Sequence, residues 1–340
     1  MTSVTTIDPA ERFLRRQTPI QRVHHVLHAY PAISPLIVLV AASVVFGLVN
    51  PRFFMPENLS LIGQQVAVVG ALAIGQTIII LTAGIDLSVG AVMVFTAMIM
   101  ASSVASFGLP APAALALGVV VGTAAGGING LLVTRLRLPP FIVTLGTLNV
   151  FVALTLLYSG GQTVQSQDIP DLLLWPGQAI DFGSFKITTG VIMMLLMYAV
   201  GSYVLRNTAW GRHIYAVGDD IEAARLAGIS VSRLLLSGYM VAGFVYAITA
   251  WIMIGRVGAA SPNAATDANL DSITAVVIGG TSLFGGRGLL IGSLLGALIV
   301  GVFRNGLALA GVDVLWQTLV VGVLVIVAVA TDQWIRRVRA

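Results

Sequence analysis

The sequence contains no cysteine, and this absence excludes several kinds of chemistry at once. Disulfides, thiolate zinc sites, iron–sulfur clusters and cysteine nucleophiles all need that side chain. Lysine is nearly absent too, because the 18 basic residues are 17 arginines and a single lysine, Lys186. This lysine lies in GSFKITTG, which does not match the G-x-x-x-x-G-K pattern of a P-loop. The chain therefore lacks the P-loop it would need to hydrolyse ATP.

Charge of either sign is also scarce. Only 9% of the 340 residues are charged and 57% are hydrophobic, with a mean hydropathy of +0.96. A soluble domain carries roughly a quarter charged residues, so this chain must use lipid as its solvent over much of its surface. The basic excess, with a pI of about 9.8, is then explained by membrane topology, and we expect no nucleic-acid partner.

Apolar blocks along the chain predict an all-α polytopic membrane protein with about ten transmembrane helices. The first block ends in Leu48-Val49-Asn50-Pro51-Arg52 without a small-residue cleavage site, so we interpret it as a retained helix and not a signal peptide. A single transmembrane domain over 33–335 then lies between tails at 1–32 and 336–340. The blocks cover 33–50, 61–82, 88–107, 111–133, 140–159, 188–205, 234–255, 270–283, 289–309 and 314–334.

The distribution of basic residues predicts the orientation of the chain in the membrane. With the N- and C-termini both cytoplasmic, 14 of the 18 basic residues fall on the inner side, which satisfies the positive-inside rule. Two connecting segments are then long enough to serve a function. One is a periplasmic loop at 160–187, where Pro170 and Pro176 prevent a single continuous helix. The other is a charged cytoplasmic loop at 206–233.

A short helix is predicted within the inner loop. Asp219-Asp220-Ile221-Glu222 forms a capping-box pattern with Asp219 as the N-cap, and Gly228 is a natural stop. Ala223, Ala224 and Arg225 between them favour a helix of about two turns. Because so short a helix is marginal in water, we expect it to dock either on a partner or on its own protein.

Four of these loop residues also carry a family resemblance. The stretch E-A-A-x-x-A-G, from Glu222 to Gly228, resembles the cytoplasmic coupling loop of permeases of ATP-binding-cassette (ABC) importers. Within the ribose, xylose, galactose and fructose group, the similarity is greatest to fructose-type permeases. The segments that carry it are RLPPFIVTLG, NTAWGR, AVGDD and AVATDQWIRRV. Further matching segments cover nearly the whole chain after the first helix: LTAGIDLSVGAVM, NGLLVTRLRLPPFIVTLGTL, GRVGAASPNA and SITAVVIGGTSLFGGRG.

The resemblance implies a permease subunit that moves a monosaccharide across the bacterial inner membrane and is not itself an enzyme. It implies ABC ATPase subunits on the cytoplasmic side, a periplasmic sugar-binding protein, a second permease copy in a homodimer, and surrounding membrane lipid. No cofactor and no metal are expected. The ATPase-coupling residues would be Asp219, Asp220, Glu222, Ala223, Ala224, Arg225 and Gly228. The alternatives are a permease for branched-chain amino acids and an ion-coupled secondary transporter.

Asp86 is a carboxylate at a break between two apolar blocks, and it admits two interpretations. It lines a substrate path or gate, or it caps, with Ser88, the broken ends of a discontinuous helix, where Gly84 and Gly90 allow the turn. We favour the cap, because a neutral sugar needs no buried anion. A similar break is predicted near Gly280, and the likeness of the two segments hints at a duplicated half.

Small and polar residues within the apolar blocks predict how the helices pack. Glycines recur every four residues at Gly118, Gly122, Gly126 and Gly130, and again at Gly288, Gly292 and Gly296, which predicts close helix packing. Three amides, Gln76, Asn129 and Asn149, either line a polar path or form hydrogen bonds between helices.

Overall fold

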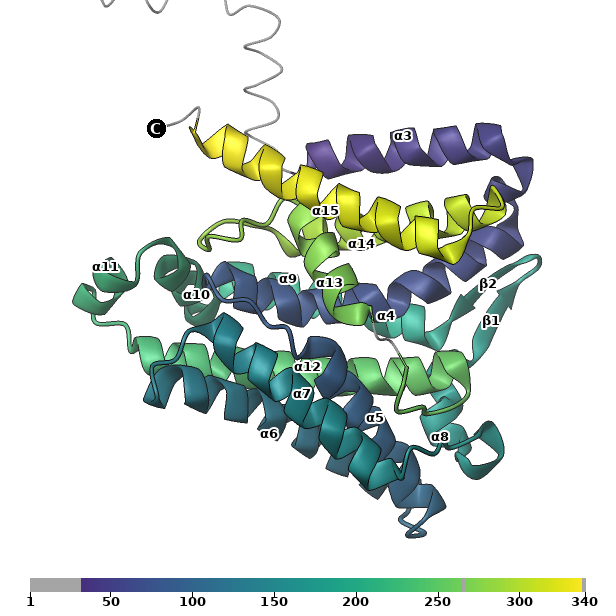
Figure 1. The fold of residues 1–340 in the computed structure, drawn as a ribbon, viewed down its shortest axis with the longest axis horizontal. Helices are drawn as coiled ribbons and strands as arrows, with labels where there is room; N and C mark the ends of the chain where they lie inside the picture. Colours follow the sequence, from purple (N-terminus) through teal and green to yellow (C-terminus); the bar gives the residue numbers. More distant parts are fainter. Residues whose placement is uncertain (1–31, 265–266, 338–340) are drawn as a thin grey trace, which may run out of the picture.

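The computed structural model describes residues 32–264 and 267–337 and consists mainly of helices (Figure 1). Each of the ten apolar blocks coincides with a helix, so the predicted helical framework of a polytopic membrane protein is confirmed. These helices are α3 (Ile33–Val49), α4 (Pro56–Leu81), α5 (Val89–Ala105), α6 (Ala111–Arg135), α7 (Pro140–Ser159), α9 (Thr189–Asn207), α12 (Val231–Val257), α13 (Ala268–Ile278), α14 (Leu290–Leu309) and α15 (Val314–Arg337).

Six of the described helices are long and apolar enough to cross a membrane: α4, α6, α7, α9, α12 and α14. The other four are shorter apolar stretches, with 17 residues in α3 and in α5, 11 in α13, and Val314–Leu324 in α15. The chain therefore passes the membrane several times. A count of ten crossings stays a prediction, as do the tails at 1–32 and 336–340, which lie outside the described residues apart from Ala32, Arg336 and Arg337.

The centre of the protein is α4, which packs against α9, α12, α13 and α14 (Figure 1). Inside the protein, 83% of its most apolar window is buried, against 28% for α7 and 22% for α9. The outer helices expose large apolar side chains such as Leu157 and Leu196. Such side chains are stable in lipid and would be costly in water.

Glycine ladders make two of the helix contacts unusually close, as the spacing predicts. A Cβ added at Gly126 of α6 would lie 2.1 Å from the carbonyl oxygen of Tyr239 in α12. In the second ladder, a Cβ at Gly296 of α14 would lie 1.8 Å from the carbonyl oxygen of Ala275 in α13. Only a residue without a side chain allows backbones to approach this far.

The segment between α7 and α9 departs from the all-α expectation. After the short helices η2 (Ser166–Asp168), α8 (Asp171–Leu174) and η3 (Trp175–Gly177), the chain forms an antiparallel hairpin of β1 (Ala179–Phe182) and β2 (Phe185–Thr188). Gly183, with φ +69°, supplies the left-handed conformation of the turn. Lys186 pairs with Asp181 across the strands at 3.3 Å. We did not predict the hairpin, because its strands have only four residues each.

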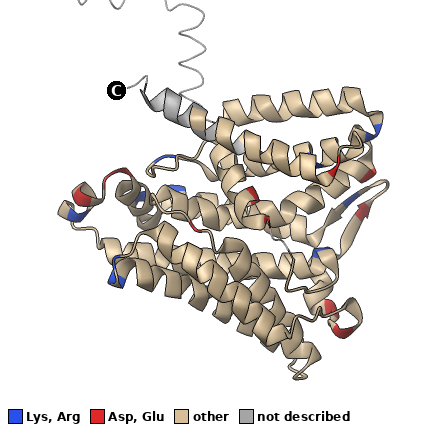
Figure 2. Cartoon of the chain, viewed as in Figure 1, with Lys and Arg blue, Asp and Glu red and all other residues tan. Residues whose placement is uncertain are grey.

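Most charged residues lie toward two opposite ends of the long helices, while acidic residues of α13 lie nearer the middle (Figure 2). One end carries α10 (Ala209–Asp219) and α11 (Ile221–Leu226), and α3 begins and α15 ends toward this side (Figure 1). The opposite end carries the hairpin. This separation is what a membrane requires, because a charge in its apolar middle is costly.

Candidate functional site

The helix predicted in the inner loop exists as α11, but its cap lies one residue later than expected. Asp220 is the N-cap, and its Oδ1 accepts hydrogen bonds from the backbone N–H groups of Glu222 (2.9 Å) and Ala223 (3.0 Å). The predicted cap, Asp219, instead ends α10, because the chain turns extended only at Asp220. Glu222 does not reach back to complete a capping box; it pairs with Arg225 at 2.8 Å.

The α11 helix stands out from the protein. Ala224 is its one buried residue, whereas Leu226 is 89% exposed and Ile221 is 39% exposed. Gly228, with φ +83°, ends the element in a left-handed conformation. An apolar surface presented on a charged loop is typical of a site where another protein docks.

The preceding helix, α10, joins α11 to the body of the protein. Trp210 Nε1 donates a hydrogen bond to Ser237 Oγ of α12 at 2.8 Å, and Tyr215 Oη donates to the carbonyl oxygen of Gly288 at 2.9 Å. Burial raises the pKa of Tyr215, so the phenol stays a neutral donor. These bonds fix α10 to both α12 and the connection that leads into α14.

The end of α10 also contacts the break after α4. A Cβ at Gly218 would lie 1.8 Å from the carbonyl oxygen of Leu81, the last residue of α4. That same oxygen accepts a hydrogen bond from Gly286 N at 2.9 Å. The end of α10 therefore contacts both interruptions of the helical framework, the one near Asp86 through Leu81 and the one near Gly280 through Gly286.

Asp86 is the centre of a buried polar cluster, with only 1% of its surface exposed. Its Oδ1 accepts hydrogen bonds from Ser88 N (2.8 Å) and Ser88 Oγ (2.6 Å), and its Oδ2 accepts one from Tyr246 Oη (3.1 Å). Asn129 Nδ2 in turn donates to Ser88 Oγ at 2.8 Å. Three predicted residues thus meet, and they tie the break to α6 and α12.

The details of the break differ from the predicted cap. Ala83, with φ +60°, takes the left-handed conformation expected of Gly84. The Ser88 side chain does not cap α5; instead, Gly90 N donates to Asn269 Oδ1 at 2.6 Å. A Cβ at Gly90 would lie 2.5 Å from that oxygen, so a larger residue there would displace the Asn269 side chain. The sequence around Gly90 does not predict this bond, because Asn269 lies far away in the chain, at the start of α13.

The other two predicted amides lie apart from this cluster. Gln76 of α4 is fully buried, and neither its Nε2 nor its Oε1 has a hydrogen-bond partner among the described residues. Asn149 of α7 is exposed, and its Nδ2 donates to the carbonyl oxygen of Leu145 at 3.1 Å. Neither amide is hydrogen-bonded to Asp86, so their predicted roles along a path remain predictions.

We expect the Asp86→Ala substitution to lower the free energy of unfolding by about 3 kcal/mol, because it strands the buried Ser88 N–H and Tyr246 hydroxyl. Asp86→Asn keeps an acceptor for Ser88 and should lose less than about half of that amount. Thermal unfolding in detergent, followed by tryptophan fluorescence, measures both. Equal stability of Asp86→Ala and the unaltered protein would contradict the importance of this cluster.

The long apolar helices of the described residues place the chain in the class of helical membrane proteins. A family profile described as "Branched-chain amino acid transport system / permease component" matches residues 58–329. The chain therefore belongs to this family of permeases. It is a multi-pass protein of the bacterial inner membrane and serves as a transport component, not as an enzyme.

Individual relatives agree over nearly the full length. The chain is 50% identical over 328 residues to the fructose import permease protein FrcC of Rhizobium meliloti, which covers 95% of this chain and 91% of the relative. It is 37% identical over 317 residues to the ribose import permease protein RbsC of Bacillus subtilis (strain 168), and this match covers 93% of this chain and 97% of the relative. The D-allose transport system permease protein AlsC of Escherichia coli (strain K12) is 34% identical over 300 residues, covering 86% and 89%. No solved structure gave a significant match.

Proposed function

We propose that the chain is the permease subunit of an ABC importer that moves a monosaccharide of the fructose or ribose class across the inner membrane. The observation that carries this proposal is the 50% identity to a fructose import permease over 95% of the chain. The family description names branched-chain amino acids, but the individual relatives named for fructose, ribose and allose favour a sugar.

A separate ATPase subunit binds α11 and supplies the energy of ATP. The exposed Leu226 and Ile221 offer it an apolar contact, and the Asp220 cap holds the helix in shape for binding. Movement of α11 passes through α10 to the break after α4, where Gly218 touches Leu81. ATP binding must then favour one access state over the other by a few kcal/mol.

The α11 end faces the cytoplasm, and both termini lie on that side. This orientation follows from the positive-inside rule, since it leaves only four of the 18 basic residues outside: Arg52, Lys186, Arg256 and Arg304. The hairpin and the short helices of 160–187 then face the periplasm. There they form the surface on which a sugar-binding protein delivers its cargo.

A second copy of the chain completes the transport unit. Asn149 supports this pairing, because it is an exposed amide in the middle of the apolar helix α7, with one hydrogen bond among the described residues. Lipid offers its remaining polar groups no partner, whereas a facing helix does. Lipid covers the outer apolar surface. Gln76, Asp86, Ser88 and Asn129 are candidates for the path or its gate.

Reconstitution of the permease with its ATPase and binding protein in proteoliposomes tests this function. We expect ATP-dependent uptake of labelled fructose or ribose and no comparable uptake of leucine. Uptake of leucine in place of sugars would identify an amino-acid permease. Sugar uptake that needs no ATPase and follows a proton gradient would overturn the ABC mechanism.

A further inference from the structure

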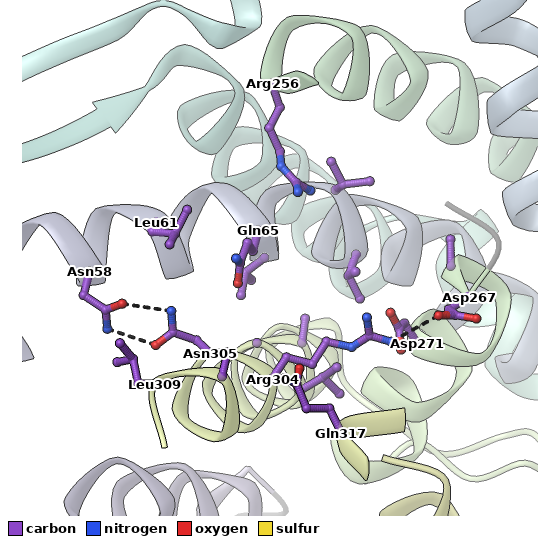
Figure 3. Close-up of a pocket in the computed structure, with 18 residues that line it drawn as sticks. Asn58, Leu61, Gln65, Arg256, Asp267, Asp271, Arg304, Asn305, Leu309 and Gln317 are labelled. Carbon is purple, nitrogen blue, oxygen red and sulfur yellow. Dashed lines mark hydrogen bonds and ion pairs between the residues drawn. The ribbon is translucent and has the colours of Figure 1, made fainter. Parts of the chain in front are cut away.

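A cavity of about 620 Å³ opens between α4, α13 and α14 toward the hairpin end of the protein (Figure 3). This volume lies within the range of roughly 300–1,000 Å³ that is usual for small-molecule sites. The motifs of the sequence do not point to this cavity, because its polar residues come from distant parts of the chain. The polar residues that line it include Asn58, Gln65, Arg256, Asp267, Asp271, Arg304 and Asn305.

Arg304 enters the cavity from α14 and leaves part of its guanidinium unused. Its Nη2 contacts Asp271 Oδ1 at 2.7 Å and Asp267 Oδ2 at 3.9 Å. Its Nε is buried and has no hydrogen-bond partner among the described residues. This Nε is closed off from the cavity, but 35% of the Arg304 side-chain surface stays exposed. The exposed part of the side chain is therefore open to a ligand in the cavity.

Two further groups in the cavity are free to bind. Gln65 of α4 lies between Arg256 and Asn305, and its side chain makes no hydrogen bond within the described residues (Figure 3). Arg256, at the end of α12, points into the same space and has no ion pair with any described residue. By contrast, Asn58 and Asn305 satisfy each other through two hydrogen bonds of 2.9 Å and act as a brace between α4 and α14.

The charges in the cavity balance, since two arginines face two aspartates. A neutral ligand with several hydroxyl groups fits this arrangement, because each hydroxyl can donate to a carboxylate and accept from a guanidinium or amide. A ligand with net charge would leave one of these groups uncompensated. Valine side chains line the remaining wall and suit the C–H face of a sugar ring: Val66, Val68, Val69 and Val300.

We propose that this cavity is a monosaccharide-binding site of the permease, in which Gln65, Arg256 and Arg304 hold the sugar hydroxyls. The proposal rests on the transport function proposed above and locates a substrate site for it. By the predicted orientation, the site lies in the outer half of the protein, where a sugar would arrive first.

A pair of neighbouring glutamines allows a matched test in the reconstituted importer. Gln65 lines the cavity, whereas Gln64, the preceding residue on the same helix, does not, and both are partly buried. We expect Gln65→Leu to raise the KM for labelled fructose about tenfold, the loss of one or two hydrogen bonds, while Gln64→Leu stays near the unaltered protein. Equal effects of the two substitutions, including no effect of either, would overturn the site.

The absence of cysteine permits a second measurement that does not depend on transport. In a Gln65→Cys variant the introduced thiol is the only one in the chain, so its reaction with a methanethiosulfonate reagent reports on the cavity alone. We expect fructose to slow this reaction and to leave unchanged the reaction of a Gln162→Cys variant, whose site is exposed in the 160–187 segment. Lack of protection at position 65 would overturn the proposal, as would equal protection of both variants.

The two proposals can fail separately. If the unaltered importer takes up fructose or ribose but Gln65→Leu behaves as Gln64→Leu does, the site is wrong and the transport function stands. If the unaltered importer takes up leucine and no sugar, the transport function itself is wrong. Protection of Gln65→Cys by leucine alone would then show the same cavity holding a zwitterion, which also carries balanced charge, and would overturn the sugar site.

Discussion

Replacing Leu226 by glutamate is expected to lower ATP-driven sugar uptake at least about 30-fold, the loss of one central contact of an interface. Leu226 is 89% exposed on α11, so the substitution leaves the fold of the permease itself intact. The new carboxylate would have to be buried against the ATPase without a partner, which is costly. Uptake and ATP hydrolysis in proteoliposomes measure the loss.

Two control variants separate the loss of the apolar contact from the effect of an added charge. Leu226→Met retains the apolar contact and should keep most of the uptake. Phe107→Glu introduces the same charge at a side chain that is 73% exposed outside the α10–α11 region, and it should leave the coupling to ATP unchanged. If Leu226→Glu couples as well as Phe107→Glu, then Leu226 does not contact the ATPase.

Gly126→Ala is expected to give the largest loss of stability of any single methyl added to α6. The new Cβ would lie 2.1 Å from the carbonyl oxygen of Tyr239 and 3.0 Å from Gly243 Cα. These are backbone atoms that no rotamer change can move, so α6 and α12 must separate. We expect a loss of about 3 kcal/mol or more, seen as a lower unfolding temperature in detergent.

The neighbouring glycine provides the control. Gly127 lies on the same helix, but a Cβ there would lie 3.5 Å from Met240 Cγ, an ordinary contact. Gly127→Ala should therefore be neutral, or stabilising by up to about 1 kcal/mol through the better helix propensity of alanine. If both variants unfold at the same temperature, the close contact of α6 with α12 contributes nothing to stability.

Much of the framework could be predicted because hydrophobic blocks and breaks are local properties. The ten blocks coincide with ten helices, and the interruptions near Asp86 and Gly280 lie where polar residues and glycines break the apolar runs. The helix at α11 followed from its propensities and end signals. Its N-cap lies one residue later than the pattern predicts, because two adjacent aspartates, Asp219 and Asp220, both fit that pattern.

The rest depends on contacts between residues that are far apart in the sequence. Tyr246 reaches Asp86 across 160 positions, and Asn269 reaches Gly90 across 179. The left-handed Ala83 also escaped prediction, because glycine normally fills such positions and Gly84 follows it directly. From the sequence, Arg304 is only one of four basic residues on the outer side. Its carboxylate partners and its unused N–H become visible only once α13 and α14 are packed.

The burial of α4 has a consequence for how the chain enters the membrane. In the finished fold this helix meets protein on most of its surface, with 83% of its apolar window buried, so lipid is not its solvent there. Its mean hydropathy of 1.8 over that window nevertheless equals that of α6, of which only 39% is buried. Helices insert one by one before they associate. The apolar side chains of α4 therefore stabilise the helix during insertion, when lipid and not protein surrounds it.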